Sequence, residues 1–240
     1  MKIIQSNLLK DSKNLLHAFT TQEVGNLAFH IGDNPIDVEK NHQALAKLLN
    51  YDKDSLIHMQ QIHSNIVYKV ESEDNFSTQP KCDALITNKP NKTLMVMVAD
   101  CTPLLFFDPL KRVIGVAHAG RAGAFSNIVG NLLKSFQEEY GSKPSDIKVV
   151  AGAAIHSCCY QVGEEIVAEA KSLHLSYAII KRQEKFYLDI TKILKRQLKE
   201  AGILAHHLEF SKECSCCHSK KYYSYRATQN RGRFCALIAL

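Results

Sequence analysis

Residues 93–120 read TLMVMVADCTPLLFFDPLKRVIGVAHAG, with three apolar runs separated by short polar breaks. The runs are Thr93–Val98, Leu104–Phe107 and Val113–Ala117. Each is shorter than an average helix and contains no interior polar residue, which is typical of a strand that is buried on both faces. We therefore predict a sheet with these strands at its centre, joined as a meander or a hairpin.

Helical and strand patterns are mixed along the rest of the chain. The spacing of apolar residues predicts helices over Val38–Asn50, Asn127–Tyr140, Glu164–Leu173 and Leu188–Ala201. Gly202 follows the last helix, in the position where a left-handed residue is favoured. Further strands are expected at Ser55–His58, Ile66–Val70, Ile147–Ile155 and Phe234–Leu240. No repeat or Pro/Gly-rich linker divides the chain, so we expect one α+β domain over residues 1–240, with a mixed sheet flanked by helices.

Composition excludes several classes of protein. Of the 240 residues, 45% are hydrophobic and 22% are charged, as in an ordinary globular protein. The net charge of +6 favours phosphate-bearing ligands and gives only weak support for nucleic-acid binding, which we do not expect. The N-terminus lacks an apolar signal core, and no apolar run approaches the roughly 20 residues that span a bilayer. We expect a cytoplasmic protein, favour a monomer, and interpret its eight cysteines as thiols or metal ligands.

Three residues at the edges of apolar runs are candidate metal ligands: His63, Cys101 and His118. One thiolate and two imidazoles suit a zinc ion that keeps a coordination position open for water or substrate. The ligands of a zinc finger cluster in the sequence, whereas these three do not, so the pattern favours a metal-dependent enzyme. Each residue taken alone also fits a structural role at the end of a strand.

Neighbouring residues are candidates for catalysis and anion binding. Asp100, next to Cys101, either orients a metal-bound imidazole, accepts a proton, or only forms a turn. The loop at Gly120–Gly123 leads into a helix start whose free N–H groups can hold an anion. Tyr222–Arg226 offers aromatic rings for stacking on a base and a guanidinium for an anion. An amphipathic edge strand explains that segment equally well.

The string Cys214–His218 is a second metal candidate. Its cysteines are closely spaced, and no second Cys-x-x-Cys pair stands at the distance that structural zinc sites use. Cys158 and Cys159 are the nearest partners in the sequence, although adjacent cysteines seldom bind one metal together. We therefore favour a cluster of packed or redox-prone thiols here.

Several strings occur in an order that is typical of one family: His30–Asn34, Gln61–His63, Cys82–Thr87, Ala99–Leu105, His118–Gly120, Cys158–Gly163, Ser224–Arg226 and Gly232–Phe234. The chain thereby resembles the YfiH/YlmD family, also labelled laccase-domain proteins or multicopper polyphenol oxidases and related to human FAMIN. The resemblance covers nearly the whole chain.

The resemblance implies a sheet sandwich flanked by helices, with zinc held by His63, Cys101 and His118. Family members look like phosphorylases and deaminases of purine nucleosides, acting on adenosine, inosine, guanosine or methylthioadenosine, so nucleoside and phosphate are the expected partners. A role in correcting cell-wall precursors is attached to some bacterial members. The expected catalytic residues are Asp100, Cys101 and His118. The expected substrate-binding residues are Gln61, Arg121, Tyr225 and Arg226.

This chain departs from the family pattern at several positions. His42 and the segment Thr21-Gln22 stand where the family carries arginines, and Ala153 replaces a proline. The usual H-A-G-W-R-G string becomes HAGRAG at residues 118–123, which loses the tryptophan and shifts the arginine to Arg121. The metal ligands are kept, so these changes bear on the shape of the pocket and on its phosphate contacts.

Two other enzyme classes and a binding module are alternatives. A copper-dependent phenol oxidase of the laccase type needs several coppers and a multi-histidine cluster. The chain has eleven histidines but only one adjacent pair, His206-His207, so we rank this class lower and expect copper activity only with metal added in vitro. A cysteine hydrolase acting on a cell-wall precursor or peptide would use Cys101 as nucleophile and His118 as base. The same residues serve both the zinc and the hydrolase hypothesis, and the sequence does not separate them.

Overall fold

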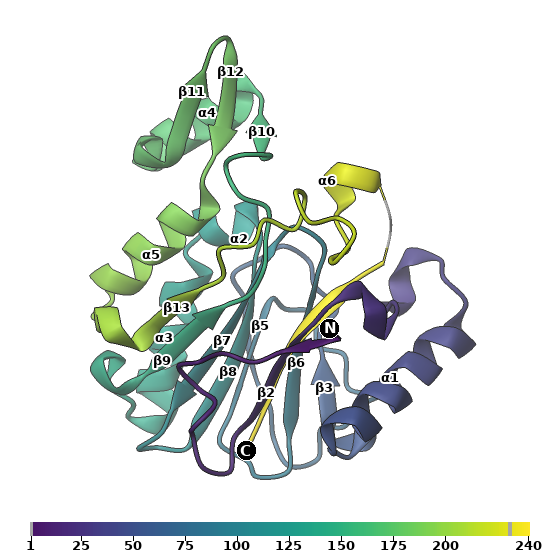
Figure 1. Ribbon diagram of the computed structural model, residues 1–240. Helices are drawn as coiled ribbons and strands as arrows, with labels where there is room; N and C mark the ends of the chain where they lie inside the picture. Colours follow the sequence, from purple (N-terminus) through teal and green to yellow (C-terminus); the bar gives the residue numbers. More distant parts are fainter. Residues whose placement is uncertain (1, 230–231) are drawn as a thin grey trace.

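Two large β-sheets pack face to face, with helices on both outer sides (Figure 1). The computed structural model describes residues 2–229 and 232–240. The five-stranded sheet has the order β1-β2-β14-β6-β3, with bounds Ile3–Ile4, Leu16–Thr20, Phe234–Ala239, Thr93–Val98 and Leu56–His58. The six-stranded sheet has the order β13-β9-β7-β8-β5-β4, with bounds Leu208–Phe210, Lys148–Ala151, Thr102–Asp108, Val113–Ala119, Ala84–Thr87 and Val67–Lys69.

Helices cover the outer faces of both sheets. The α-helices of the described residues are α1 (Pro35–Leu49), α2 (Arg121–Phe125), α3 (Ile128–Tyr140), α4 (Glu164–Ser172), α5 (Ile190–Glu200) and α6 (Tyr225–Thr228). Helix α1 packs on the five-stranded sheet, and α2, α3 and α5 pack on the six-stranded sheet. A third sheet, of order β10-β12-β11 with bounds Gln161–Val162, Lys185–Leu188 and Ile179–Arg182, projects with α4 at the top of Figure 1. The predicted α+β architecture is confirmed.

Burial on two faces explains why the central strands are apolar throughout. In β6, the side chains of Leu94, Val96 and Val98 belong to the core between the two sheets. Met95 and Met97 alternate with them and belong to the core beneath α1. Strands β7, β8 and β14 divide their side chains between two cores in the same way. The period-two alternation is therefore present, but both faces are apolar.

The connection after β6 differs from the predicted meander. Strands β7 and β8 form the expected antiparallel hairpin, whereas β6 pairs with β14 and β3 in the other sheet. The chain crosses between the sheets at Asp100, whose φ of 89° lies outside the usual range for a non-glycine residue. The predicted loop at Gly120–Gly123 is mostly the short helix α2. The Tyr222–Arg226 segment is no strand, because Tyr225 begins α6.

A group of stacked rings lies under α1 and includes two buried histidines. His42 of α1 and His58 of β3 are stacked with ring centroids 5.9 Å apart, and His58 also contacts Phe29 and Phe76. In the described part of the chain, Nε2 of His58 has no hydrogen-bond partner. Burial lowers the pKa of His58 to about 4, with a further lowering by the charge of His42.

The stability of the fold is expected to fall on acidification through this histidine. Because the folded pKa of His58 lies below the unfolded value of 6.5, the unfolded state binds more protons between these pKa values, so stability is full above pH 6.5 and is lost toward pH 4. The loss from His58 between pH 7 and pH 5 is about 2 kcal/mol. Urea unfolding of the wild type and of His58→Phe at both pH values measures it. His174→Asn, at an exposed histidine, is the control, and an equal pH dependence in wild type and His58→Phe would contradict the assignment.

Candidate functional site

The fold brings His63, Cys101 and His118 together at one end of the β7–β8 hairpin. Cys101 precedes β7, His118 is the penultimate residue of β8, and His63 lies in the loop between β3 and β4. The Pro103–His118 pairing in the sheet sets Cys101 beside the end of β8. One ligand atom from each of the three residues lies within 4.8 Å of the others. The rings of His63 and His118 meet edge to face, with centroids 4.9 Å apart.

Asp83, fully buried before β5, positions two of the three side chains. Its Oδ1 lies 2.8 Å from Nδ1 of His118 and accepts the backbone N–H of His63 at 3.1 Å. Its Oδ2 accepts the N–H and the hydroxyl of Ser64 at 2.6 and 2.7 Å, and the N–H of Ile62 at 3.2 Å. A carboxylate on Nδ1 directs Nε2 of His118 toward Cys101 as a ligand atom. The same contacts hold His63 at its positive φ of 60°.

The charges at the site favour a thiolate beside a protonated or metal-bound imidazole. Burial raises the pKa of the Cys101 thiol, but the charge and hydrogen bond of His118, together with His63, outweigh it and lower the pKa. Burial lowers the pKa of His118, but Cys101 and Asp83 outweigh it and raise the pKa. The Asp83 carboxyl, despite burial, has a lowered pKa because His118 and Ser64 donate to it. The arrangement stabilises a sulfur anion, which is the form that binds metals.

Gly120 keeps space open beside Cys101 and His63. A Cβ at this position would lie 2.8 Å from Sγ of Cys101 and 3.3 Å from Cδ2 of His63. One thiolate and two imidazoles, one of them bonded to a buried carboxylate, fit a zinc ion with three protein ligands. Gly120 therefore allows the backbone to approach Cys101 and His63 closely.

Two of the three side chains, His63 and Cys101, line a pocket of about 370 Å³. Its size lies within the range of small-molecule sites. His118 itself is not in the wall, which is lined by His63, Ala99, Asp100, Cys101, Thr102, Ala119, Gly120, Arg121, Ile155, Tyr160, Ile190, Tyr225, Arg226 and Arg233. Three arginines in one wall make the pocket attractive to an anion, and aromatic and aliphatic side chains offer an apolar surface.

Hydrogen bonds fix the polar residues of the pocket wall. Arg226 donates through Nη1 to the carbonyls of Gln161 and Cys159 at 3.0 and 3.3 Å, and its guanidinium lies 5.3 Å from the Tyr160 ring centroid. Arg121 forms an ion pair with Glu169 of α4. These contacts link the wall to the small third sheet and to α4.

The contacts of Asp100 differ from those expected for one of its predicted roles, the orientation of a metal-bound imidazole. Its carboxylate accepts the Ser215 hydroxyl and the backbone N–H of Arg226, each at 2.7 Å. The carboxylate that orients the imidazole of His118 is Asp83, not Asp100. Asp100 still lines the pocket, so its second predicted role, that of a proton acceptor, remains a prediction.

Two positions named from the sequence lie away from the pocket. The side-chain amide of Gln61 exchanges hydrogen bonds with the backbone of Met97 at 2.8 and 2.9 Å and is not part of the wall. His42 is buried in α1 with Nε2 2.8 Å from the carbonyl of Leu27. His42 is therefore not part of the pocket wall. The site also includes Asp83, Tyr160 and Arg233. The sequence contained them only within the family strings, and no chemical argument had pointed to them.

Comparison with known proteins places the chain in a family. Residues 18–240 match the family described as multi-copper polyphenol oxidoreductase laccase. The chain belongs to this family. The predicted resemblance to YfiH and YlmD proteins is confirmed.

Relatives within this laccase family cover nearly the whole chain. The purine nucleoside phosphorylase YlmD of Bacillus subtilis is 31% identical over 96% of this chain and 90% of its own length. The crystal structure of the hypothetical protein YfiH of Bacillus licheniformis superposes with a TM-score of 0.93, at 27% identity, over 100% of this chain and 96% of that one. YlmD of Geobacillus stearothermophilus superposes with a TM-score of 0.89, at 25% identity, over the same shares. Across the described residues, no helix is both long and apolar enough to span a membrane.

Proposed function

We propose that this protein is a zinc-dependent purine nucleoside phosphorylase, with zinc held by His63, Cys101 and His118. The observation that carries the proposal is the position of these three side chains beside a pocket with Arg121, Arg226 and Arg233 in its wall. Phosphorolysis needs both elements, an anion site for phosphate and stabilisation of charge on the departing base. The name that the Bacillus subtilis relative carries agrees with this chemistry.

The reaction transfers a ribosyl group from a base to phosphate. A phosphate oxygen forms a bond to C1′ of the ribose, and the bond between C1′ and the base nitrogen breaks with its electron pair on the base. The base then takes up a proton, so the products are ribose 1-phosphate and the free base. The arginines of the wall hold the phosphate, because guanidinium groups bind its oxygens in pairs.

The other wall residues bind the nucleoside and transfer the proton that the departing base takes up. Tyr160 and Tyr225 offer ring faces to a purine, and Ile155 adds apolar surface. Asp100, fixed by Ser215 and the backbone of Arg226, is the residue we propose to accept the proton of the attacking phosphate and to pass it to the departing base. Zinc held by His63, Cys101 and His118 would supply Lewis-acid chemistry beside the pocket. That chemistry also serves deamination of adenosine, which we propose as a second activity at the same pocket.

Copper-dependent phenol oxidation is the function that the family name suggests. A laccase needs several coppers held by many histidines. Within the described residues, His63 and His118 belong to the one candidate metal group that contains histidine, and that group has three members. The donor set therefore favours a single zinc ion.

A panel of nucleosides tests the proposal. The purified zinc-loaded protein is incubated with adenosine, inosine, guanosine and methylthioadenosine, with and without phosphate, and the products are separated by chromatography. Free base is expected only when phosphate is present, and inosine is expected from adenosine with or without it. Full release of base without phosphate would indicate a hydrolase instead, and no product from any nucleoside would contradict the proposed function.

A further inference from the structure

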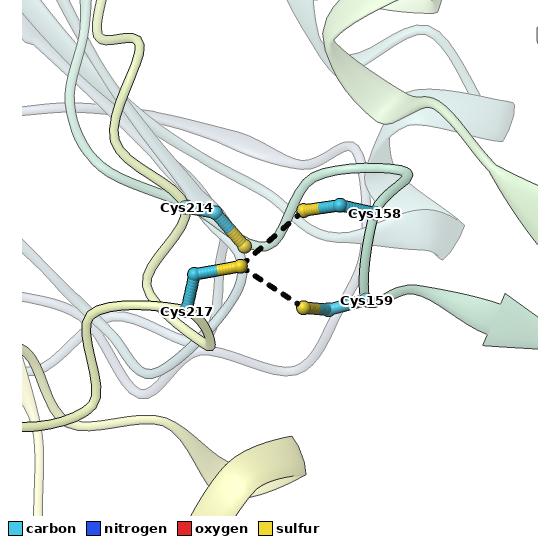
Figure 2. A group of neighbouring side chains, drawn as sticks. All are labelled: Cys158, Cys159, Cys214 and Cys217. Carbon is cyan, nitrogen blue, oxygen red and sulfur yellow. Dashed lines mark hydrogen bonds between the residues drawn. The ribbon is translucent and has the colours of Figure 1, made fainter.

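Four cysteines from two separate segments meet outside the pocket wall (Figure 2). Cys158 and Cys159 lie in the turn before β10, and Cys214 and Cys217 lie in the loop between β13 and α6. Their sulfur atoms all lie within 4.8 Å of one another. The sequence favoured packed or redox-prone thiols at Cys214–His218, because the nearest partner pair, Cys158 and Cys159, consists of adjacent cysteines that seldom bind one metal together. The fold supplies that pair, and Cys214 with Cys217 forms a Cys-x-x-Cys unit.

The spacing of the sulfur atoms is that of ligands around one ion. Sγ of Cys217 lies 3.6 Å from Sγ of Cys158 and 3.3 Å from Sγ of Cys159 (Figure 2). Zinc–sulfur bonds of about 2.3 Å in a tetrahedron set the sulfurs about 3.8 Å apart. A disulfide would need a distance of about 2 Å between two sulfur atoms, and it would join only two of the four cysteines. The group therefore matches a tetrathiolate site more closely than a disulfide.

Backbone contacts hold the two segments together beside the sulfurs. Ala154 forms a bridge with Cys214 and accepts the N–H of Ser215 at 2.9 Å. The N–H of His156 donates to Sγ of Cys214 at 3.3 Å, a contact that supports a sulfur anion. Arg226, which donates to the carbonyl of Cys159, and Arg182, which donates to that of Ser157 at 3.1 Å, place two positive charges beside the same turn. Four thiolates around a divalent ion carry a net negative charge, and the two positive charges stabilise that charge.

We propose that Cys158, Cys159, Cys214 and Cys217 bind a structural zinc ion, separate from the ion at His63, Cys101 and His118. Soft thiolates select zinc over magnesium or calcium, and four protein ligands leave no position for substrate. The ion ties together two segments of the pocket wall, because Tyr160 follows the first cysteine pair and Arg226 follows the second. The proposal does not rest on the reaction that the pocket performs.

Metal content measured in the full chain tests this site. Protein is purified under reducing conditions from zinc-supplemented cultures, and zinc per chain is measured by mass spectrometry of the metal. Cys101→Ser disables the other site, so the zinc that remains reports on the four cysteines. We expect about one zinc per chain in Cys101→Ser. We expect nearly no zinc in two double variants, which combine Cys101→Ser with either Cys217→Ser or Cys158→Ser. Cys217 and Cys158 are both exposed.

Cobalt(II) and a neighbouring cysteine complete the test. Cobalt added to metal-free Cys101→Ser protein is expected to give the intense thiolate charge-transfer bands of a tetrahedral site, and Cys217→Ser is expected to remove them. Cys216→Ser is the matched control, because Cys216 lies in the same loop but outside the group of four. It is expected to keep both the zinc and the cobalt bands. A folded Cys101→Ser chain with reduced thiols that binds neither metal would overturn the proposal, as would a disulfide among the four in freshly purified, metal-free protein.

Discussion

Cys101→Ser is expected to lower the rate of nucleoside phosphorolysis by about 10³-fold or more. Serine keeps the size of the side chain but replaces the thiolate, the soft ligand at the site, with a neutral hydroxyl. Loss of the metal removes several kcal/mol of charge stabilisation in the transition state, and each 1.36 kcal/mol corresponds to about a tenfold change in rate. Zinc content at this site and kcat/KM for inosine with phosphate are the two measurements.

His63→Ala separates the metal enzyme from a cysteine hydrolase. A hydrolase with Cys101 as nucleophile needs His118 as its base, and both would remain in this variant. A zinc site loses one of its three ligands, so we expect the same loss of metal and of activity as in Cys101→Ser. His63 is exposed, so its removal leaves the core unchanged. A His63→Ala protein that keeps most of its activity without zinc would contradict the metal-dependent mechanism, and Cys216→Ser is the control that keeps its activity.

The central strands could be predicted from the sequence because both of their faces are buried. The runs at Thr93–Val98 and Phe234–Leu240 correspond to β6 and β14, which lie side by side in one sheet. Their pairing could not be predicted, since local apolar character does not identify a partner far along the chain. The simplest expectation was that β6 and β7 would pair in one sheet, but the chain crosses to the other sheet at Asp100. Asp100 has a positive φ there, which could not be predicted from the sequence. Short strands such as β10 lack the length for a pattern.

The three proposed metal ligands could be predicted from the sequence, whereas contacts that only the fold makes could not. His63, Cys101 and His118 were proposed from their chemistry, and the structure brings them together. The sequence disfavoured a metal site at the cysteine group because adjacent cysteines seldom bind one metal together. Its two halves lie far apart in the sequence, and nothing in the sequence shows that they meet beside the bridge between Ala154 and Cys214. Asp83 gave no chemical signal, since one acidic residue before an apolar strand has many ordinary explanations.

Asp83→Asn is expected to weaken zinc binding and to lower activity by about 10- to 100-fold, the range for outer-shell partners of metal ligands. The Asp83 carboxylate accepts hydrogen bonds from His118, from Ser64 and from the N–H of His63. An amide has one acceptor oxygen, so its NH₂ group would face a donor and displace either His118 or the loop of His63. Asp83→Ala removes every acceptor and is expected to destabilise the fold by about 3–5 kcal/mol, because His118 loses its buried partner.

Asp108→Asn is the matched control for this prediction. Asp108 is also fully buried and accepts two backbone N–H groups, from Leu110 and Lys111, but it lies at the opposite end of β7. Zinc affinity is measured by competition with a chelator, and stability by urea unfolding of the metal-free proteins. If Asp83 acts by positioning the ligands, its asparagine variant loses zinc affinity beyond any loss of stability, whereas Asp108→Asn keeps it. Equal zinc affinity in the two variants would mean that Asp83 has only a structural role. The orientation of His118 would then need another cause.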